Sequence, residues 1–153
     1  MSYEVIKFLH VFGAIIFVGN ITVTAVWKSL ADRTRNPAVI GFSQRLVTIT
    51  DIAFTLLGVV LLAITGPVLA AQAGLLHRNW VILGETLFAL TGVVWLGVLI
   101  PVQYKQAQLA RQFAAGGAIP DQYWRLARMW TVAGSIATLL PLVIVALMVI
   151  KPL

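Results

Sequence analysis

Hydrophobic residues along the chain gather in four long runs, and short stretches between the runs contain most of the charged side chains. The runs cover about residues 3–27, 47–70, 80–104 and 130–150. Each run is long enough to cross the roughly 30 Å hydrocarbon layer of a bilayer as a helix. The pattern predicts an all-α fold in which residues 1–153 form a single transmembrane domain, a polytopic four-helix bundle.

The composition agrees with a membrane protein and narrows its chemistry. The chain is 60% hydrophobic and 10% charged, whereas about 25% of the residues of a soluble domain are charged. Its mean hydropathy is +0.96, so the lipid bilayer is the expected environment. Because the chain has no cysteine, disulfides, thiolate metal sites and cysteine nucleophiles are excluded. The basic residues lie between the apolar runs, so we interpret them as topology signals and lipid contacts and expect no nucleic-acid partner.

The distribution of lysine and arginine predicts how the bundle is oriented. Residues 28–46 contain four of these side chains and residues 105–128 contain four, whereas the opposite side of the membrane has three, Lys7, Arg78 and Lys151. The positive-inside rule then places both basic loops in the cytoplasm and the N- and C-termini outside. We expect a multi-pass protein of the inner (cytoplasmic) membrane.

The first apolar run contains a stripe of small and polar residues. On a helix that advances about 100° per residue, His10, Gly13, Asn20, Thr24 and Lys28 lie within one arc. Lipid cannot satisfy such polar groups, so the stripe must face other helices or water. We expect the remaining helices to assemble around this stripe.

One polar cluster is predicted in the outer half of the membrane. His10 lies roughly 10 Å and Glu85 roughly 8 Å below the outer boundary, with His77 just above them. Glu85 could orient the His10 imidazole or relay a proton with it. His10 is also compatible with simple packing, haem ligation or metal handling. His10, His77 and Glu85 are possible metal ligands by type, but the chain has no HxxxH or HExxH spacing, so no metal site is predicted.

A second polar cluster is predicted near the inner boundary. An ionised carboxylate in hydrocarbon costs a few kcal/mol, so Asp51 needs a partner. We expect an ion pair with Arg45 or Arg128. Asn20 and Thr24 belong to this cluster, because the inner end of the first helix is expected to face Asp51 across the bundle. On the third run, Glu85 and Gln103 are expected to share one helix face, and Gln103 to lie near the depth of Asp51.

The chain resembles an uncharacterised bacterial family of four-helix predicted integral membrane proteins. The segments LHVFGAIIFVGN, TAVWK and RTRNPAVIGFSQRLVTITD, together with Trp80 and Glu85, carry this resemblance over nearly the full length. That family has no established function, so the resemblance implies a fold rather than an activity.

A more distant similarity is to HemJ-type protoporphyrinogen oxidases and CopD-like membrane domains. Lys7, His10 and Gly19 match a Lys-x-x-His-…-Gly pattern in the first helix of HemJ proteins, and Leu76-His77 resembles their Leu-His opening of the third helix. The resemblance implies b-type haem with His10 as a ligand. The chain lacks a lysine after His77, where Asn79 and Trp80 stand, and a later third-helix histidine.

Two functions follow as hypotheses. The first is a small membrane redox protein that holds haem b through His10, with His77 as a second ligand or surface proton group and Glu85 as a tuning or relay group. The second is a non-enzymatic module: an accessory or scaffold subunit, or a small transporter component, whose polar stripe forms a water path or contacts a partner. Exposed small-residue faces also allow a homodimer or another membrane protein as partner.

Overall fold

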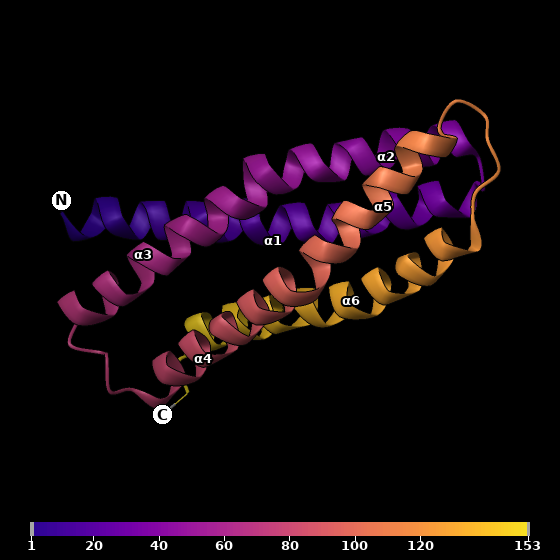
Figure 1. Cartoon of the computed structure of the whole chain (residues 1–153). Coiled ribbons are helices and arrows are strands. Elements are labelled where there is room, and N and C mark those ends of the chain that lie inside the picture. Colours follow the sequence, from indigo (N-terminus) through magenta and orange to yellow (C-terminus); the bar gives the residue numbers. More distant parts are fainter. Residues whose placement is uncertain (1, 153) are drawn as a thin grey trace.

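The computed structural model describes residues 2–152, and these form four long, continuous helices (Figure 1). All four are long and apolar enough to cross a membrane, so the predicted all-α membrane fold is confirmed. The first helix is α1 (Tyr3–Arg33) and the last is α6 (Asp121–Ile150). The second comprises α2 (Pro37–Thr50), η1 (Asp51–Leu56) and α3 (Leu57–Gln72), and the third comprises α4 (Asn79–Val94), η2 (Trp95–Leu99) and α5 (Ile100–Phe113).

The helices form two antiparallel hairpins that meet at one end of the bundle. α1 packs mainly against α3, α4 packs against α6, and α2 packs against α5 to join the hairpins. We call the end with the connections 34–36 and 114–120 the basic end, and the end with both termini and the connection 73–78 the terminal end. In Figure 1, α2 and α5 lie together at the basic end, whereas α3 and α4 diverge towards the terminal end.

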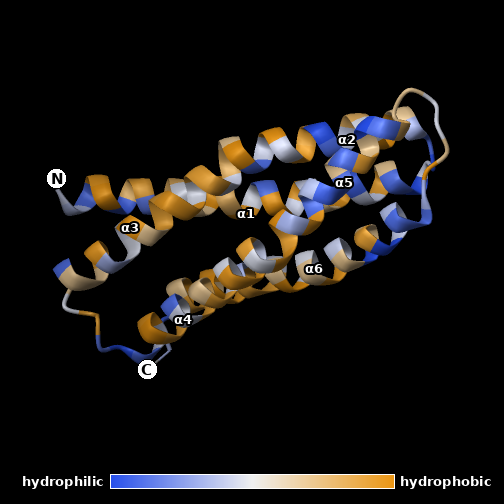
Figure 2. Cartoon of the chain, in the orientation of Figure 1, coloured by the Kyte–Doolittle hydropathy of each residue, from blue (hydrophilic) through white to orange (hydrophobic). Residues whose placement is uncertain are grey.

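The helices extend well beyond the predicted membrane spans at the basic end. The second helix has 36 residues and is therefore about 54 Å long, whereas its apolar run covers about residues 47–70. Figure 2 shows hydrophilic residues concentrated on the parts of the helices that lie at the basic end. A separate apolar cluster holds these extensions together, formed by Ile40, Ala110, Phe113, Tyr123 and Ala127.

Local sequence signals explain where the helices begin and end at the basic end. The Asn36 side chain accepts hydrogen bonds from the backbone N–H groups of Ala38 at 2.9 Å and Val39 at 3.3 Å, and Pro37 occupies the first helical position. Both features favour a helix start. After α5, Gly116 has a φ of +106°, a conformation that glycine adopts at no steric cost.

α1 and α3 approach each other closely at two glycines. A Cβ added to Gly58 would lie 2.7 Å from the Cβ of Phe17 and 2.9 Å from the carbonyl oxygen of Gly13. A side chain at this position would therefore push the two helices apart. Gly19 and Gly92 have no heavy atom within 4 Å of an added Cβ, so close packing does not explain them.

Two π-helical turns interrupt the second and third helices near mid-length, and the apolar pattern did not predict either of them. They are η1, which begins at Asp51, and η2, which begins at Trp95. A π-turn accommodates one extra residue and rotates the following segment relative to the preceding one. Such turns are frequent at functional sites, and both lie beside the polar centre described next.

Candidate functional site

Asp51 lies at the centre of a polar cluster that joins three helices. Its Oδ1 accepts hydrogen bonds from the Thr55 hydroxyl at 3.0 Å and from Asn20 Nδ2 at 3.3 Å, and its Oδ2 accepts one from Gln103 Nε2 at 2.6 Å. The side chain is half-buried. The Asp51 carboxylate therefore has three neutral donors that come from α1, η1 and α5.

Asn20 connects this cluster to the rest of α1. Its Nδ2 lies 2.8 Å from Thr55 Oγ1 and 3.3 Å from both the Thr50 carbonyl oxygen and Asp51 Oδ1. Its Oδ1 accepts a hydrogen bond from the Thr24 hydroxyl at 3.4 Å. Three oxygens thus surround an amide nitrogen that carries only two hydrogens. On the stripe predicted for the first helix, the side chains of Asn20 and Thr24 face the interior of the bundle.

The expected ion pair between Asp51 and Arg45 or Arg128 is wrong. Among residues 2–152, the only ion pair joins Lys28 and Asp32. Arg45 and Arg128 are both exposed. Arg45 precedes Asp51 by six residues, which places it roughly 120° away around the helix, and Arg128 points away from the buried face of α6 that contains Ala127. The prediction chose these arginines because they lie at a depth similar to that of Asp51. Their side chains point in other directions around their helices, so they do not reach the carboxylate.

A small cavity of about 70 Å³ lies beside Asp51 between the two hairpins. Its polar lining consists of Asp51 and Gln103 with three threonines, and its apolar lining includes four aromatic rings: Thr24, Thr91 and Thr138, and Phe17, Phe88, Trp95 and Trp130. Pockets for small organic ligands have volumes of about 300–1,000 Å³. This cavity can hold a few water molecules or a small ion, and a cofactor or organic substrate does not fit in it.

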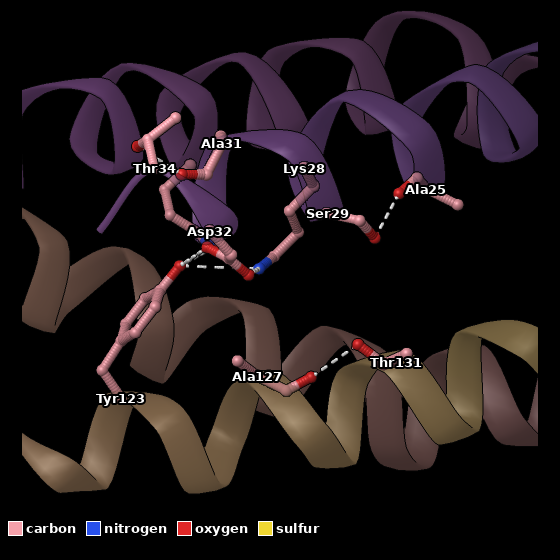
Figure 3. A network of polar contacts seen from close by, with 10 residues as sticks. Ala25, Lys28, Ser29, Ala31, Asp32, Thr34, Tyr123, Ala127 and Thr131 are labelled. Carbon is pink, nitrogen blue, oxygen red and sulfur yellow. Dashed lines mark hydrogen bonds and ion pairs between the residues drawn. The ribbon is translucent and has the colours of Figure 1, made fainter. Parts of the chain in front are cut away.

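A second polar network closes the basic end (Figure 3). Lys28 Nζ donates to Asp32 Oδ2 at 2.7 Å, and the Tyr123 hydroxyl donates to Asp32 Oδ1 at 2.6 Å. Gln44 Nε2 donates to the Tyr123 oxygen at 3.0 Å. Lys28 is 1% exposed, and its Nζ lies 4.9 Å from the centre of the Trp130 ring. We call these five residues the clamp, because they join α1, α2 and α6.

An aromatic contact separates the cavity from the diverging ends of the hairpins. The rings of Phe17 on α1 and Phe88 on α4 meet edge to face, with centroids 6.5 Å apart. Phe17 is buried between α1 and α3 at the Gly58 crossing. Asp51 therefore has an aromatic contact towards the terminal end and the clamp towards the basic end.

Thr65 orients the His10 ring. The sequence had suggested Glu85 for this role. The Thr65 hydroxyl donates to the Leu61 carbonyl at 2.6 Å, so its oxygen is the acceptor for His10 Nδ1–H at 2.9 Å. A neutral imidazole in this arrangement has its free lone pair on Nε2. Glu85 is exposed on α4, and within the described range no hydrogen bond or ion pair connects it to His10.

The two histidines do not meet in a common site. His77 lies exposed in the turn between α3 and α4, whereas His10 packs against Thr65 and Gly66 on α3. Neither lines the cavity beside Asp51. Ligation of one haem by both side chains stays a prediction. Single ligation through His10 Nε2 fits the orientation of its ring, and haem coordination stays a prediction.

Several residues of the site were not among the sequence candidates, although two of them had a usable signal. Thr55 follows Asp51 by four residues and Asp32 follows Lys28 by four, a spacing that brings side chains together on a helix. Tyr123 and Gln44 have no such signal, because their contacts depend on how separate helices pack. Gln106 was also missed: it is fully buried, and neither atom of its amide has a hydrogen-bond partner among residues 2–152.

Comparison with known proteins identifies the family. Neither a curated protein nor a solved structure matches the chain. The model of one family, described as predicted integral membrane protein (DUF2269), matches residues 4–152. This range includes the four helices except Tyr3 at the start of α1, and it contains the Asp51 cluster and the clamp. The chain therefore belongs to the DUF2269 family of predicted integral membrane proteins.

Proposed function

We propose that this protein is a small membrane transport component that binds a monovalent cation, a proton or Na⁺, at Asp51. One observation carries the proposal: the Asp51 carboxylate lies inside a bundle of membrane-spanning helices with three neutral donors and no cationic partner in the described residues. An ionisable side chain within membrane-spanning helices is expensive and usually marks an ion or proton pathway.

The chemistry of the cluster suits a small cation. Binding a proton or Na⁺ at Asp51 would neutralise a charge that otherwise costs a few kcal/mol in hydrocarbon. Oxygens of Thr50, Asp51 and Thr55 all lie within 3.3 Å of the Asn20 amide nitrogen. Hard cations prefer oxygen ligands. If the Asn20 side chain moved modestly, a cation could take the place of its amide nitrogen among these three oxygens. The adjacent cavity of about 70 Å³ matches an ion or water in size.

The barriers on either side of Asp51 support transport over static binding. A transporter exposes a central site to one side of the membrane at a time. The Phe17–Phe88 contact limits access from the terminal end, and the clamp limits access from the basic end. Opening the aromatic contact breaks no hydrogen bond, whereas opening the clamp breaks the hydrogen bond from the Tyr123 hydroxyl on α6 to Asp32 on α1. We infer that Asp51 exchanges more readily with the terminal end.

Ion flux into liposomes tests the proposal. Purified protein is reconstituted into liposomes that contain a pH-sensitive dye, and a valinomycin-driven potassium potential, negative inside, is imposed in sodium-free buffer. We expect faster acidification than in protein-free liposomes if the cation is a proton. A parallel measurement of radioactive sodium uptake detects Na⁺. If neither flux exceeds that of protein-free liposomes, the proposal fails.

Matched variants assign the flux to the site. Asp51→Asn should abolish it, and Asp121→Asn, which makes the same change at an exposed position, should leave it unchanged. Asp51→Glu keeps a carboxylate but displaces it, so it should reduce the flux while the protein still folds. This variant therefore tests the proposal even if Asp51→Asn does not fold. Equal flux in wild-type protein and in both Asp51 variants would also refute the proposal.

A second candidate function is binding of b-type haem at His10. The observation in its favour is the His10–Thr65–Leu61 chain of hydrogen bonds, because ligating histidines are commonly held by a hydrogen bond from the other ring nitrogen. A reduced-minus-oxidised visible spectrum of protein purified from haem-replete cells should show haem bands that His10→Ala removes. Colourless protein would exclude this function and would leave the Asp51 proposal untouched.

A further inference from the structure

A groove with two arginines lies between α2 and α5 at the basic end. It has a volume of about 590 Å³, and its lining includes Arg45 from α2 and Arg111 from α5. The helices close it at one end, where a Cβ added to Gly41 would lie 2.6 Å from the Cβ of Ala114. This volume is within the range of sites that take small organic groups.

The groove is positively charged, and no carboxylate of the described residues pairs with its two arginines. Arg45 and Arg111 are exposed, and no carboxylate lies within ion-pair distance of either in the described residues, where the only ion pair joins Lys28 and Asp32. Arginine guanidinium groups present several donors in a fork that matches a phosphate. Two such groups on facing helices can therefore hold one phosphate between them.

Apart from Gln44 and Thr48, the rest of the lining has no polar side chain, and it extends towards the predicted hydrocarbon layer. Phe42 is 68% exposed and Ile49 is 56% exposed, and both line the groove with Ala107. The apolar run of the second helix begins at about residue 47, so Ile49 lies inside the predicted membrane. Arg45 lies about 6 Å further out. A polar site for a headgroup thus continues into an apolar surface for an acyl chain.

We propose that this groove binds an anionic phospholipid of the surrounding bilayer. The phosphate contacts Arg45 and Arg111, and the first part of an acyl chain lies along Ile49 and Ala107. Clefts with basic side chains between membrane helices bind anionic headgroups in this manner on the cytoplasmic side, which is where the positive-inside rule places the basic end. The inference is independent of the Asp51 proposal, because the two sites share no residue.

Native mass spectrometry of the detergent-solubilised protein tests the proposal. The protein is titrated with dioleoylphosphatidylglycerol and, separately, with dioleoylphosphatidylcholine. We expect one tightly bound molecule of the anionic lipid and at least tenfold weaker binding of the zwitterionic one. The Arg45→Gln, Arg111→Gln double variant should bind phosphatidylglycerol at least about tenfold more weakly, because two charge-assisted contacts are lost.

Two further variants separate a specific groove from general surface charge. The Arg125→Gln, Arg128→Gln variant removes the same charge from exposed positions on α6 outside the groove and should bind the lipid within twofold of the wild type. Thr48→Trp, at an exposed position in the lining, fills the groove while both arginines remain, and it should weaken binding. Equal losses in the two arginine pairs, or wild-type binding in Thr48→Trp and in the groove pair, would overturn the proposal.

Discussion

The clamp at the basic end makes the sharpest prediction about stability. Asp32→Ala removes the anionic partner of Lys28, whose side chain is 1% exposed. Breaking a buried ion pair by removal of one partner costs about 3–5 kcal/mol, because the other charge remains buried without compensation. The Trp130 ring lies 4.9 Å from Lys28 Nζ before and after the change, so this cation–π contact does not alter the difference. Asp32 is 17% exposed, which favours the lower end of the range. We therefore expect the free energy of unfolding to fall by about 3 kcal/mol.

A double-mutant cycle separates this explanation from a general effect of mutating the helix end. In Lys28→Met, Asp32→Ala both charges are gone, and an apolar side chain occupies the buried position of Lys28. Replacement of a buried ion pair by apolar groups is often neutral, so the double variant should be at least about 1 kcal/mol more stable than Asp32→Ala alone. Asp121→Ala, at an exposed carboxylate of the same end, should change stability by less than about 0.5 kcal/mol.

Reversible unfolding in mixed detergent micelles, followed by circular dichroism, measures these free energies. The reasoning is refuted if Asp32→Ala loses less than about 1 kcal/mol, since a carboxylate with a buried cationic partner cannot be that dispensable. It is also refuted if the effects of Lys28→Met and Asp32→Ala simply add. Additivity would mean that the two side chains, although 2.7 Å apart, contribute independently.

Three other variants test the packing of the bundle. Gly58→Ala should destabilise the protein by about 1–3 kcal/mol, because its Cβ would lie 2.7 Å from that of Phe17. Gly19→Ala, whose Cβ would have no heavy atom within 4 Å, should be neutral or slightly stabilising. Equal unfolding free energies for the two variants would contradict the close crossing of α1 and α3. Gln106→Leu should stabilise the protein by about 1–2 kcal/mol, because it removes two buried polar atoms without partners in the described residues; a lower melting temperature would mean that the amide is satisfied by ordered water.

The membrane spans could be predicted from the sequence, because the bilayer selects apolar runs of a fixed length. The polar stripe on the first helix could also be predicted, since α1 has no π-turn and the phase of its residues holds from His10 to Lys28. Depth alone was a poor guide to contacts between helices. It brought Asp51 together with Arg45 and Arg128 as well as Gln103, and it could not show that Gln103 is the one that donates to Asp51, at 2.6 Å.

The apolar pattern also could not predict how far each helix extends at the basic end. Hydropathy indicates where a helix enters lipid, but α2 and α5 continue outside because their faces pack against each other. The clamp belongs to this region. Its ion pair has a local signal in the spacing of Lys28 and Asp32, whereas the contribution of Tyr123 depends on the docking of α6 and is not encoded in any short segment.

The π-turn η2 explains why Glu85 and Gln103 do not share one helix face. Glu85 and Gln103 are eighteen residues apart, so on a regular α-helix they would share one face. η2 lies between them and accommodates one extra residue, which rotates the two segments by roughly 100° relative to each other. Gln103 then faces Asp51 while Glu85 is exposed. The same turn contributes Trp95 and Leu99 to the cavity beside Asp51. The irregularity therefore separates the faces of Glu85 and Gln103, so that one helix directs a neutral donor at Asp51 and leaves its carboxylate away from the bundle interior.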